Sequence, residues 1–190
     1  AEENLRCALD GFFTQNVSKV AVVKDREETV DILTHSISNS MATLRFMDLT
    51  SENLRRLSQM TIAITDIERL SDHAENIIEY VEYLKSKKAN LSQIAVKELK
   101  KMSHDTLEAV NLSLNIFETE DYSLLDEMEA LEKQVDKQEK DLIDKHIDRL
   151  VIQLLRCIDL LNQTVLHNND PGCHGHSLDL VVRDVNKGGS

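Results

Sequence analysis

Apolar residues recur along most of the chain at the three- and four-residue spacing of an amphipathic helix. One long run of this kind consists of Met60, Ile64, Ile67, Ala74, Ile78 and Val81. Thr50 or Ser51 is suited to cap the helix that contains this run, because a hydroxyl oxygen accepts hydrogen bonds from the first free N–H groups. We therefore predict helices at about residues 2–15, 17–47, 51–86, 91–118, 120–149 and 151–167, with loop and tail from Asn168 onward.

The composition favours an all-α protein. The 190 residues include five glycines, one proline and 4% aromatic residues, which is little for a protein built from strands and turns. Hydrophobic residues make up 41% of the chain, which is enough to form a core. We expect a folded helical protein of one or two small domains.

The chain resembles itself when it is shifted by 105 residues without a gap. The shift superposes seven identical pairs, namely Leu9 with Leu114, Phe12 with Phe117, Thr14 with Thr119, Ser18 with Ser123, Glu27 with Glu132, Val30 with Val135 and Asp31 with Asp136. Apolar positions of two helices often align by chance. The match of both acidic pairs, Glu27 with Glu132 and Asp31 with Asp136, makes chance a weaker explanation. We expect two tandem helical bundles, at residues 1–87 and 88–190.

Three Glu-x-x-x-Asp pairs lie beside the apolar stripe of their helices. They are Glu27 with Asp31, Glu68 with Asp72, and Glu132 with Asp136. Residues four apart project from one helix face on successive turns, so the two carboxylates of a pair repel each other, and burial adds to the cost. A cation that prefers oxygen ligands would relieve both effects. The alternative is an ordinary solvated acidic face, neutralised by Arg26, Arg69, Lys133 and Lys140.

Charge and cysteine content narrow the range of partners and compartments. The formal net charge of −12 disfavours binding to nucleic acid or to an anionic membrane. Three cysteines without a CxxC spacing imply no disulfide framework and fit a reducing compartment. No apolar segment approaches the length of a membrane span, and Glu2, Glu3 and Arg6 argue against a signal peptide. We expect this chain itself not to insert into a membrane.

The segment from Asp66 to Ile77, with the sequence DIERLSDHAENI, closely resembles the signature of the PhoU family. The segments 25–31 and 131–136 look like the other acidic motif of that family, one copy in each half. Residues 49–56 and 145–150 are most similar to the PhoU-like cytoplasmic domain of bacterial sodium/phosphate cotransporters. The resemblance covers about residues 5–150, and the segment 66–77 is its specific part.

The resemblance implies two tandem three-helix bundles that hold metal ions, either an iron cluster or another divalent cation such as zinc or manganese. Glu27, Asp31, Glu68 and Asp72 would form the first site, and Glu132 and Asp136 half of the second. The protein would restrain phosphate uptake from the cytoplasm, free or attached to an inner-membrane transporter. Its partners would be the membrane domain of a phosphate transporter or a signalling kinase, and a homodimer is also considered.

The C-terminal part departs from the family pattern. Residues 178–185 place Asp184 where Asp66 stands in the first half, but no further acids follow, so we expect the second half and its metal site to be incomplete. Residues 151–170 also match the family poorly. The sequence offers no explanation for that segment.

Other candidate sites are weaker. Cys173, His174 and His176 could ligate zinc, but they lie in a Pro/Gly loop without a second ligand cluster. His73 could orient Asp72 or simply pack. No histidine follows a glutamate by three residues, as a ferritin-like di-iron centre requires, and nucleophile triads and phosphate loops are missing from the sequence. We therefore expect no enzyme, with a metal-free helical adaptor and a dimetal hydrolase or oxidase as the alternatives.

Overall fold

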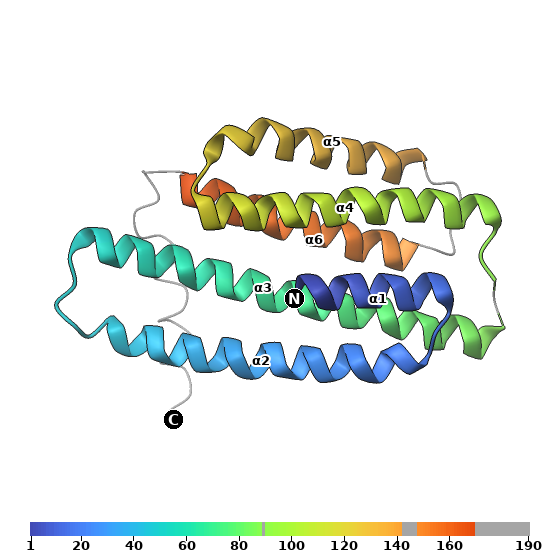
Figure 1. The fold of residues 1–190 in the computed structure, drawn as a ribbon, viewed down its shortest axis with the longest axis horizontal. Helices are drawn as coiled ribbons and strands as arrows, with labels where there is room; N and C mark the ends of the chain where they lie inside the picture. Colours follow the sequence, from blue (N-terminus) through green and yellow to red (C-terminus); the bar gives the residue numbers. More distant parts are fainter. Residues whose placement is uncertain (89, 142–147, 170–190) are drawn as a thin grey trace, which may run out of the picture.

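The computed structural model describes residues 1–88, 90–141 and 148–169, and all regular structure in these ranges is helical. The elements are α1 (Glu2–Thr14), α2 (Ser18–Leu44), α3 (Ser51–Lys87), α4 (Gln93–Thr119), the 3-10 turn η1 (Tyr122–Leu124), α5 (Leu125–Asp141) and α6 (Asp148–Asn169). Figure 1 shows α1, α2 and α3 as one bundle and α4, α5 and α6 as a second beside it. The prediction of an all-α fold with two three-helix bundles is confirmed.

Local signals in the sequence fix most helix ends. The side chains of Thr50 and Ser92 accept hydrogen bonds from backbone N–H groups three residues ahead, at 3.2 and 3.1 Å, and so cap α3 and α4. Three helices end on a residue in the left-handed conformation, Gln15, Lys88 and Glu120, with φ of 54°, 50° and 54°. The helix starts and ends predicted for the first half agree with these caps to within a few residues.

The predicted helix 120–149 needs a correction. The chain first forms η1, because Asp121 accepts hydrogen bonds from the backbone N–H and the hydroxyl of Ser123, and α5 begins only at Leu125. At the other end, α6 begins at Asp148, so residues 148 and 149 belong to α6 and not to the preceding helix. Residues 142–147 lie outside the described part of the chain.

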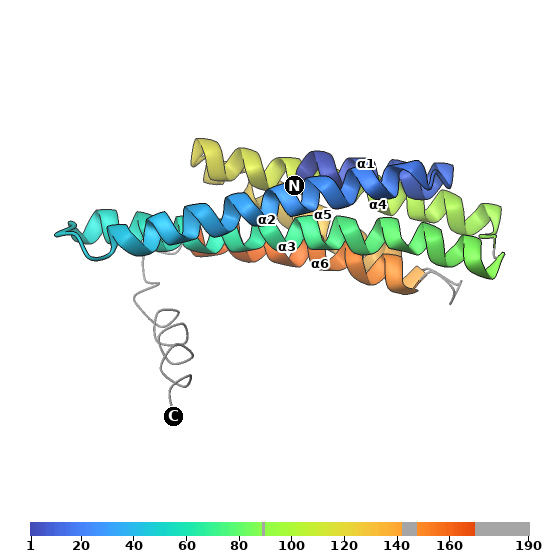
Figure 2. The ribbon, with the colours of Figure 1, turned by 90° about the horizontal axis from the view of Figure 1, so that it is seen from below.

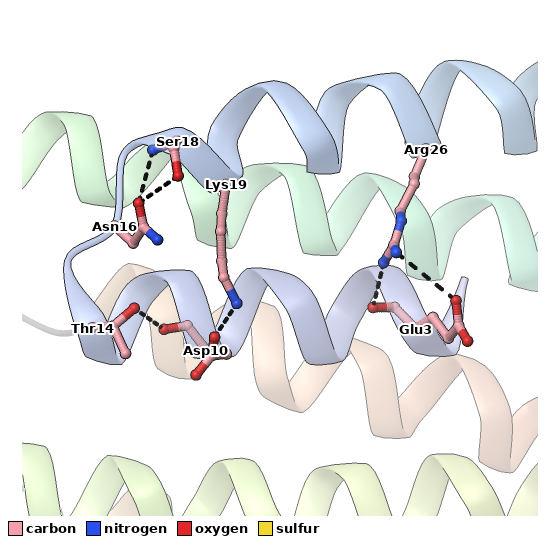
Figure 3. Close-up of polar contacts among 7 residues, drawn as sticks. All are labelled: Glu3, Asp10, Thr14, Asn16, Ser18, Lys19 and Arg26. Atoms are coloured by element: carbon pink, nitrogen blue, oxygen red, sulfur yellow. Dashed lines mark hydrogen bonds and ion pairs between the residues drawn. The ribbon is translucent and has the colours of Figure 1, made fainter.

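The turns after α1 and α4 are built alike, 105 residues apart. Asn16 Oδ1 accepts from the N–H and hydroxyl of Ser18 at 3.0 and 2.7 Å, as Figure 3 shows. Asp121 Oδ1 accepts from the N–H and hydroxyl of Ser123 at 3.1 and 2.6 Å. This Asx turn lets the side chain stand in for a backbone turn. The register found in the sequence is therefore the register of the two bundles in space.

The two bundles share one hydrophobic core. The helix α3 packs against α6, and α1 packs against α4, so buried residues from both halves form a single cluster. Figures 1 and 2 show the long helix α3 running between α2 and α6. Its last residue, Lys87, ends the first bundle, while the domain boundary at 87/88 stays a prediction.

The helix α6 accounts for the segment that the sequence left unexplained. Leu150, Leu154 and Cys157 on α6 are at most 1% exposed, so the segment serves to pack the two halves together. It supplies the third helix of the second bundle well before residues 178–185, which lie outside the described residues together with Asp184. No helix among the described residues is long and apolar enough to cross a membrane.

Candidate metal site

Glu27 lies on the stripe of α2 that faces the rest of the first bundle. It follows Val20 and Val23 at spacings of three and four residues, and both valines are buried. A carboxylate at the next position of this stripe is drawn toward the core, and Glu27 is half-buried. The helix α3 runs antiparallel to α2 (Figure 1), and the charge of Asp72 on α3 acts on Glu27.

Four carboxylates surround Glu27 and perturb its ionisation. Burial is the largest cause that raises the pKa of Glu27, followed by the negative charges of Glu75, Asp72, Asp31 and Glu28. Two of these charges come from α3 and two from α2 itself. The region between α2 and α3 around Glu27, which we call the acidic seam, therefore concentrates negative charge where water is partly excluded.

The antiparallel packing also relates the remaining pair of predicted ligands. Asp31 lies four residues after Glu27 on α2, and Glu68 lies four residues before Asp72 on α3. Because the two helices are antiparallel, Asp31 and Glu68 lie on the same side of Glu27 and Asp72. Asp31 is exposed, whereas Glu68 and Asp72 are half-buried. The four residues predicted for the first site thus occupy one stretch of two neighbouring helices.

These four side chains do not converge on one point in the structure. Among the described residues, three ligand atoms of different side chains come within 4.8 Å of one another only at His104, Asp105 and Glu108. The carboxylates of the acidic seam lie near one another, but no three of them bring oxygen atoms within 4.8 Å of one another. A cation bound there would draw the carboxylates inward from the positions that they hold in its absence.

The basic residues that were proposed to neutralise the acids pair mostly with other partners. Arg26 donates to the backbone oxygen of Glu3 at 3.2 Å and lies 4.0 Å from its carboxylate (Figure 3). Arg69 lies 3.7 Å from Asp66 on its own helix. In the second half, Lys133 pairs with an acid one turn away on α5. The side chain of Lys140 lies outside the described residues.

A lysine that sequence reasoning missed does enter the acidic seam. Lys24, one turn before Glu27 on α2, lies 2.6 Å from Glu79 and 3.5 Å from Glu75. The hydrogen bond to Glu79 is the main cause of the raised pKa of Lys24. Lys24 therefore compensates the α3 acids beyond Asp72, at one end of the seam. Only the antiparallel register of α2 and α3, which no local pattern specifies, could have revealed it.

Asn4 ties the three helices of the first bundle together beside the acidic seam. Its Nδ2 donates to the backbone oxygen of Val23 and to Ser71 Oγ, both at 3.1 Å, and the side chain is 1% exposed. Val23 lies one turn before Glu27, and Ser71 directly precedes Asp72. A single buried amide thus helps to set the relative positions of α2 and α3 at the site.

The second half carries one arm of a comparable site. Glu132 and Asp136 on α5 match Glu27 and Asp31 in exposure, the glutamate half-buried and the aspartate exposed in each pair. The facing helix α6 has a single acid, Asp159, between residues 150 and 160, and hence no Glu-x-x-x-Asp pair there. The incomplete second site stays a prediction.

A second polar cluster, on α4, was missed by the sequence reasoning although its spacing was visible. His104 Nδ1 lies 3.5 Å from Asp105 and 3.9 Å from Glu108. Asp105 is buried and accepts hydrogen bonds from the amides of Gln134 and Gln138 on α5. Burial alone would raise the pKa of Asp105, but the amides and the imidazole lower it on balance. These bonds make Asp105 a structural link between α4 and α5.

His73 belongs to the packing between the two halves. It is half-buried on α3, and its Nδ1 atom has no hydrogen-bond partner among the described residues. Burial is the main cause of its lowered pKa, while Gln153 of α6 opposes the shift and Arg156 adds to it. A neutral His73 at the interface of α3 and α6 fits the packing interpretation. Cys173, His174 and His176 lie outside the described residues.

The comparison with protein families agrees with these features of the first bundle. A model of the PhoU domain matches residues 1–81, which include the acidic seam and the signature segment 66–77. Residues 1–81 are therefore similar to the PhoU domain. The matched residues comprise α1, α2 and most of α3, and the remainder of the chain follows the same helical design without matching the family model.

Solved structures extend the likeness in fold to both halves. The crystal structure of PhoU from Pseudomonas aeruginosa matches with a TM-score of 0.68 and 16% identity, over 87% of this chain and 83% of that one. The phosphate transport system regulatory protein PhoU from Streptococcus pneumoniae matches with a TM-score of 0.66 and 19% identity, over 87% and 81% of the two chains. Curated protein sequences give no match.

Proposed function

We propose that the protein is a regulator of phosphate uptake that works by binding and not by catalysis. The likeness of residues 1–81 to the PhoU domain supports this role, as does the fold shared with a protein described as a phosphate transport regulator. The charged groups that meet in the acidic seam are carboxylates and one lysine, which suit ion binding. The chain would act as a cytoplasmic domain that changes the state of a transporter or of its signalling kinase.

The proposed cofactor site is the acidic seam, with Glu27, Asp31, Glu68 and Asp72 as ligands. The observation that carries this proposal is the placement of half-buried Glu27 among carboxylates of both α2 and α3, which together with burial raises its pKa. A bound cation would offset both effects, and a purely carboxylate donor set suits hard ions such as ferric iron or manganese and also accepts zinc. The residues present therefore fit the implied metal.

Metal binding is tested by titrating purified, chelator-treated protein with Mn²⁺, Zn²⁺ and ferrous iron in a calorimeter. The double variant Glu27→Gln/Asp72→Asn should lose at least about tenfold in affinity, which corresponds to about 1.4 kcal/mol. Glu129→Gln is the matched control, because Glu129 is an exposed acid paired with Lys133 away from the seam. Equal affinities for the wild type and the double variant would refute the site.

A metal-free adaptor is the second candidate, and Lys24 is the observation that favours it. A lysine in the seam already offsets part of the negative charge, at Glu75 and Glu79. If that is the whole role of the seam, Lys24→Gln should destabilise the protein and no cation should restore it. If the seam binds metal, Lys24→Gln should tighten binding, because one competing positive charge is removed.

Docking on a transporter is tested separately from metal binding. The chain should co-purify with the membrane domain of a phosphate transporter encoded next to it or in the same polypeptide, or with the associated kinase. Co-purification that persists in Glu27→Gln/Asp72→Asn would support the regulatory role and reject a need for metal. Failure to bind either partner, with metal binding intact, would instead reject the regulatory role.

A further inference from the structure

Lysines are concentrated at one end of a chain that is acidic overall. We call residues 85–101 the basic end; it contains the end of α3, the connection and the start of α4, and the structure describes all of it except Ala89. Six lysines and one glutamate give it a formal charge of +5, in a chain of −12. The lysines are Lys85, Lys87, Lys88, Lys97, Lys100 and Lys101. Figures 1 and 2 show this part of α3 and α4 at the end of the molecule opposite the loop between α2 and α3.

The six lysines of the basic end carry charge that the protein itself does not neutralise. All six are exposed, and none of them forms an ion pair with an acid among the described residues. Elsewhere on the described surface, Lys19, Lys24 and Lys133 each pair with a carboxylate. Glu98, the single acid of the basic end, is half-buried. The positive charge of this surface is therefore free to attract an anionic ligand.

A line of aromatic rings connects the lysines of α3 with those of α4. Lys87 lies 6.0 Å from the ring centre of Tyr83 on α3, and Lys100 lies 5.6 Å from the ring centre of Phe13 on α1. Ring centroids are 5.2, 6.2 and 5.2 Å apart along the series Phe13, Phe12, Tyr80 and Tyr83. Lysines of both helices thus surround one aromatic cluster. The helix α1 reaches this end of the molecule and contributes two rings to it, so the exposure of the lysines does not depend on where α1 begins.

Exposed apolar side chains lie among these lysines. Ile94 is 69% exposed, and it shares a face of α4 with Lys97 and Lys101, which follow it by three and seven residues. Tyr83 is 44% exposed at the end of α3. Ammonium groups around an apolar side chain suit the surface of an anionic bilayer, because the charges meet the headgroups while the apolar group reaches between them. An acidic protein surface would instead leave Ile94 against charged groups.

We propose that the basic end is a docking surface for an anionic lipid bilayer. The net charge of −12 disfavours such a surface for the chain as a whole, but salt screens charges that lie more than about 8 Å from it at physiological ionic strength. The helix α3 has 37 residues and is therefore about 55 Å long, so the acids toward its other end lie far beyond that distance. Contact would orient the molecule with the basic end on the membrane and the acidic remainder away from it.

Sedimentation with lipid vesicles tests this proposal. The vesicles contain no transporter, so the result is independent of the proposed role in phosphate uptake. The full chain should bind vesicles of phosphatidylglycerol and phosphatidylcholine at least a hundredfold more tightly than vesicles of phosphatidylcholine alone, because each lysine near an anionic surface contributes about fivefold. In 1 M NaCl, where the screening length falls to about 3 Å, this difference should disappear.

Paired variants locate the contact on the molecule. Lys97→Gln/Lys101→Gln should weaken binding to the anionic vesicles at least tenfold. Arg55→Gln/Arg56→Gln is the matched control, because it removes the same charge from exposed positions near the opposite end of α3 and should leave binding unchanged. Ile94→Gln keeps the charge and should weaken binding about three- to tenfold, because the apolar contact is lost.

Four results would overturn the proposal. The first is equal binding to the anionic and the neutral vesicles, and the second is an equal loss in the arginine control. The third is release from the vesicles by inorganic phosphate well beyond that caused by NaCl of the same ionic strength, since the surface would then select a free anion. The fourth is unchanged binding by Ile94→Gln, which would leave only charge attraction and favour an acidic protein surface as the natural partner.

Discussion

Replacing Asn4 should weaken the first bundle at the point where it supports the acidic seam. The Asn4 amide donates two buried hydrogen bonds, one to the Val23 backbone and one to Ser71 Oγ. Asn4→Ala removes both donors, while most of the surrounding atoms stay in place because α1, α2 and α3 pack on either side. The loss therefore falls on hydrogen bonding more than on helix formation, since alanine is the better helix former.

The size of the loss follows from the two bonds. Each buried hydrogen bond contributes about 1 kcal/mol net, so their removal costs about 2 kcal/mol. Asn4 Oδ1 has no partner among the described residues, and its removal returns part of that loss, whereas the vacated volume adds to it. We expect a net destabilisation of about 2 kcal/mol, which for a chain of this size lowers the melting temperature by about 4–8 °C.

A double-mutant cycle separates the hydrogen bond from its surroundings. Urea unfolding followed by circular dichroism would be measured for the wild type, Asn4→Ala, Ser71→Ala and the double variant. The bond between the two side chains predicts a coupling free energy of about 1 kcal/mol. A coupling below about 0.3 kcal/mol, which is the usual error of additivity, would refute the reasoning. Asn4→Asp should cost more than Asn4→Ala, because it buries a carboxylate beside acceptors.

Three further predictions concern single sites. In chelator-treated protein, Glu27→Gln should raise stability at pH 7 by about 0.5 kcal/mol, the scale of a like-charge pair. Because the pKa of Glu27 is raised in the folded protein, the wild type gains stability as the pH falls through that pKa. The stability advantage of the variant should therefore shrink as the pH falls toward 4.5, the ordinary pKa of a glutamate. Thermal melts at pH 7 and pH 5 would reveal this change. Gly11→Ala should destabilise the protein by about 1 kcal/mol although alanine is the better helix former, because the new Cβ meets Ile78 Cδ1. Adding Ile78→Val, which removes that Cδ1 atom, should recover part of the lost stability in urea melts. Cys157 is fully buried, and burial raises the pKa of its thiol. In native protein at pH 8, iodoacetamide should therefore label Cys7 far faster than Cys157. In urea the two cysteines should react at equal rates, as peptide mass spectrometry would measure.

The helices were predictable because the signals that define them are local. The spacing of apolar residues, the Thr50 cap and the repeat register each depend on a few neighbouring positions, and all appear in the structure. The start of α6 was misplaced, since the boundary before it falls in a charged segment without a glycine or proline. Helix ends without such residues depend on tertiary packing, which no short window contains.

The sequence predicted the acidic pairs within each helix of the candidate site, but not how the two helices face each other. Spacing along one helix identified Glu27 with Asp31 and Glu68 with Asp72, but not which residues of α3 lie opposite α2. That register is set by core packing, and it brings Glu75 and Lys24 into the seam. Glu75 stands in the signature segment three residues after Asp72, so a search at spacings of three as well as four would have found it.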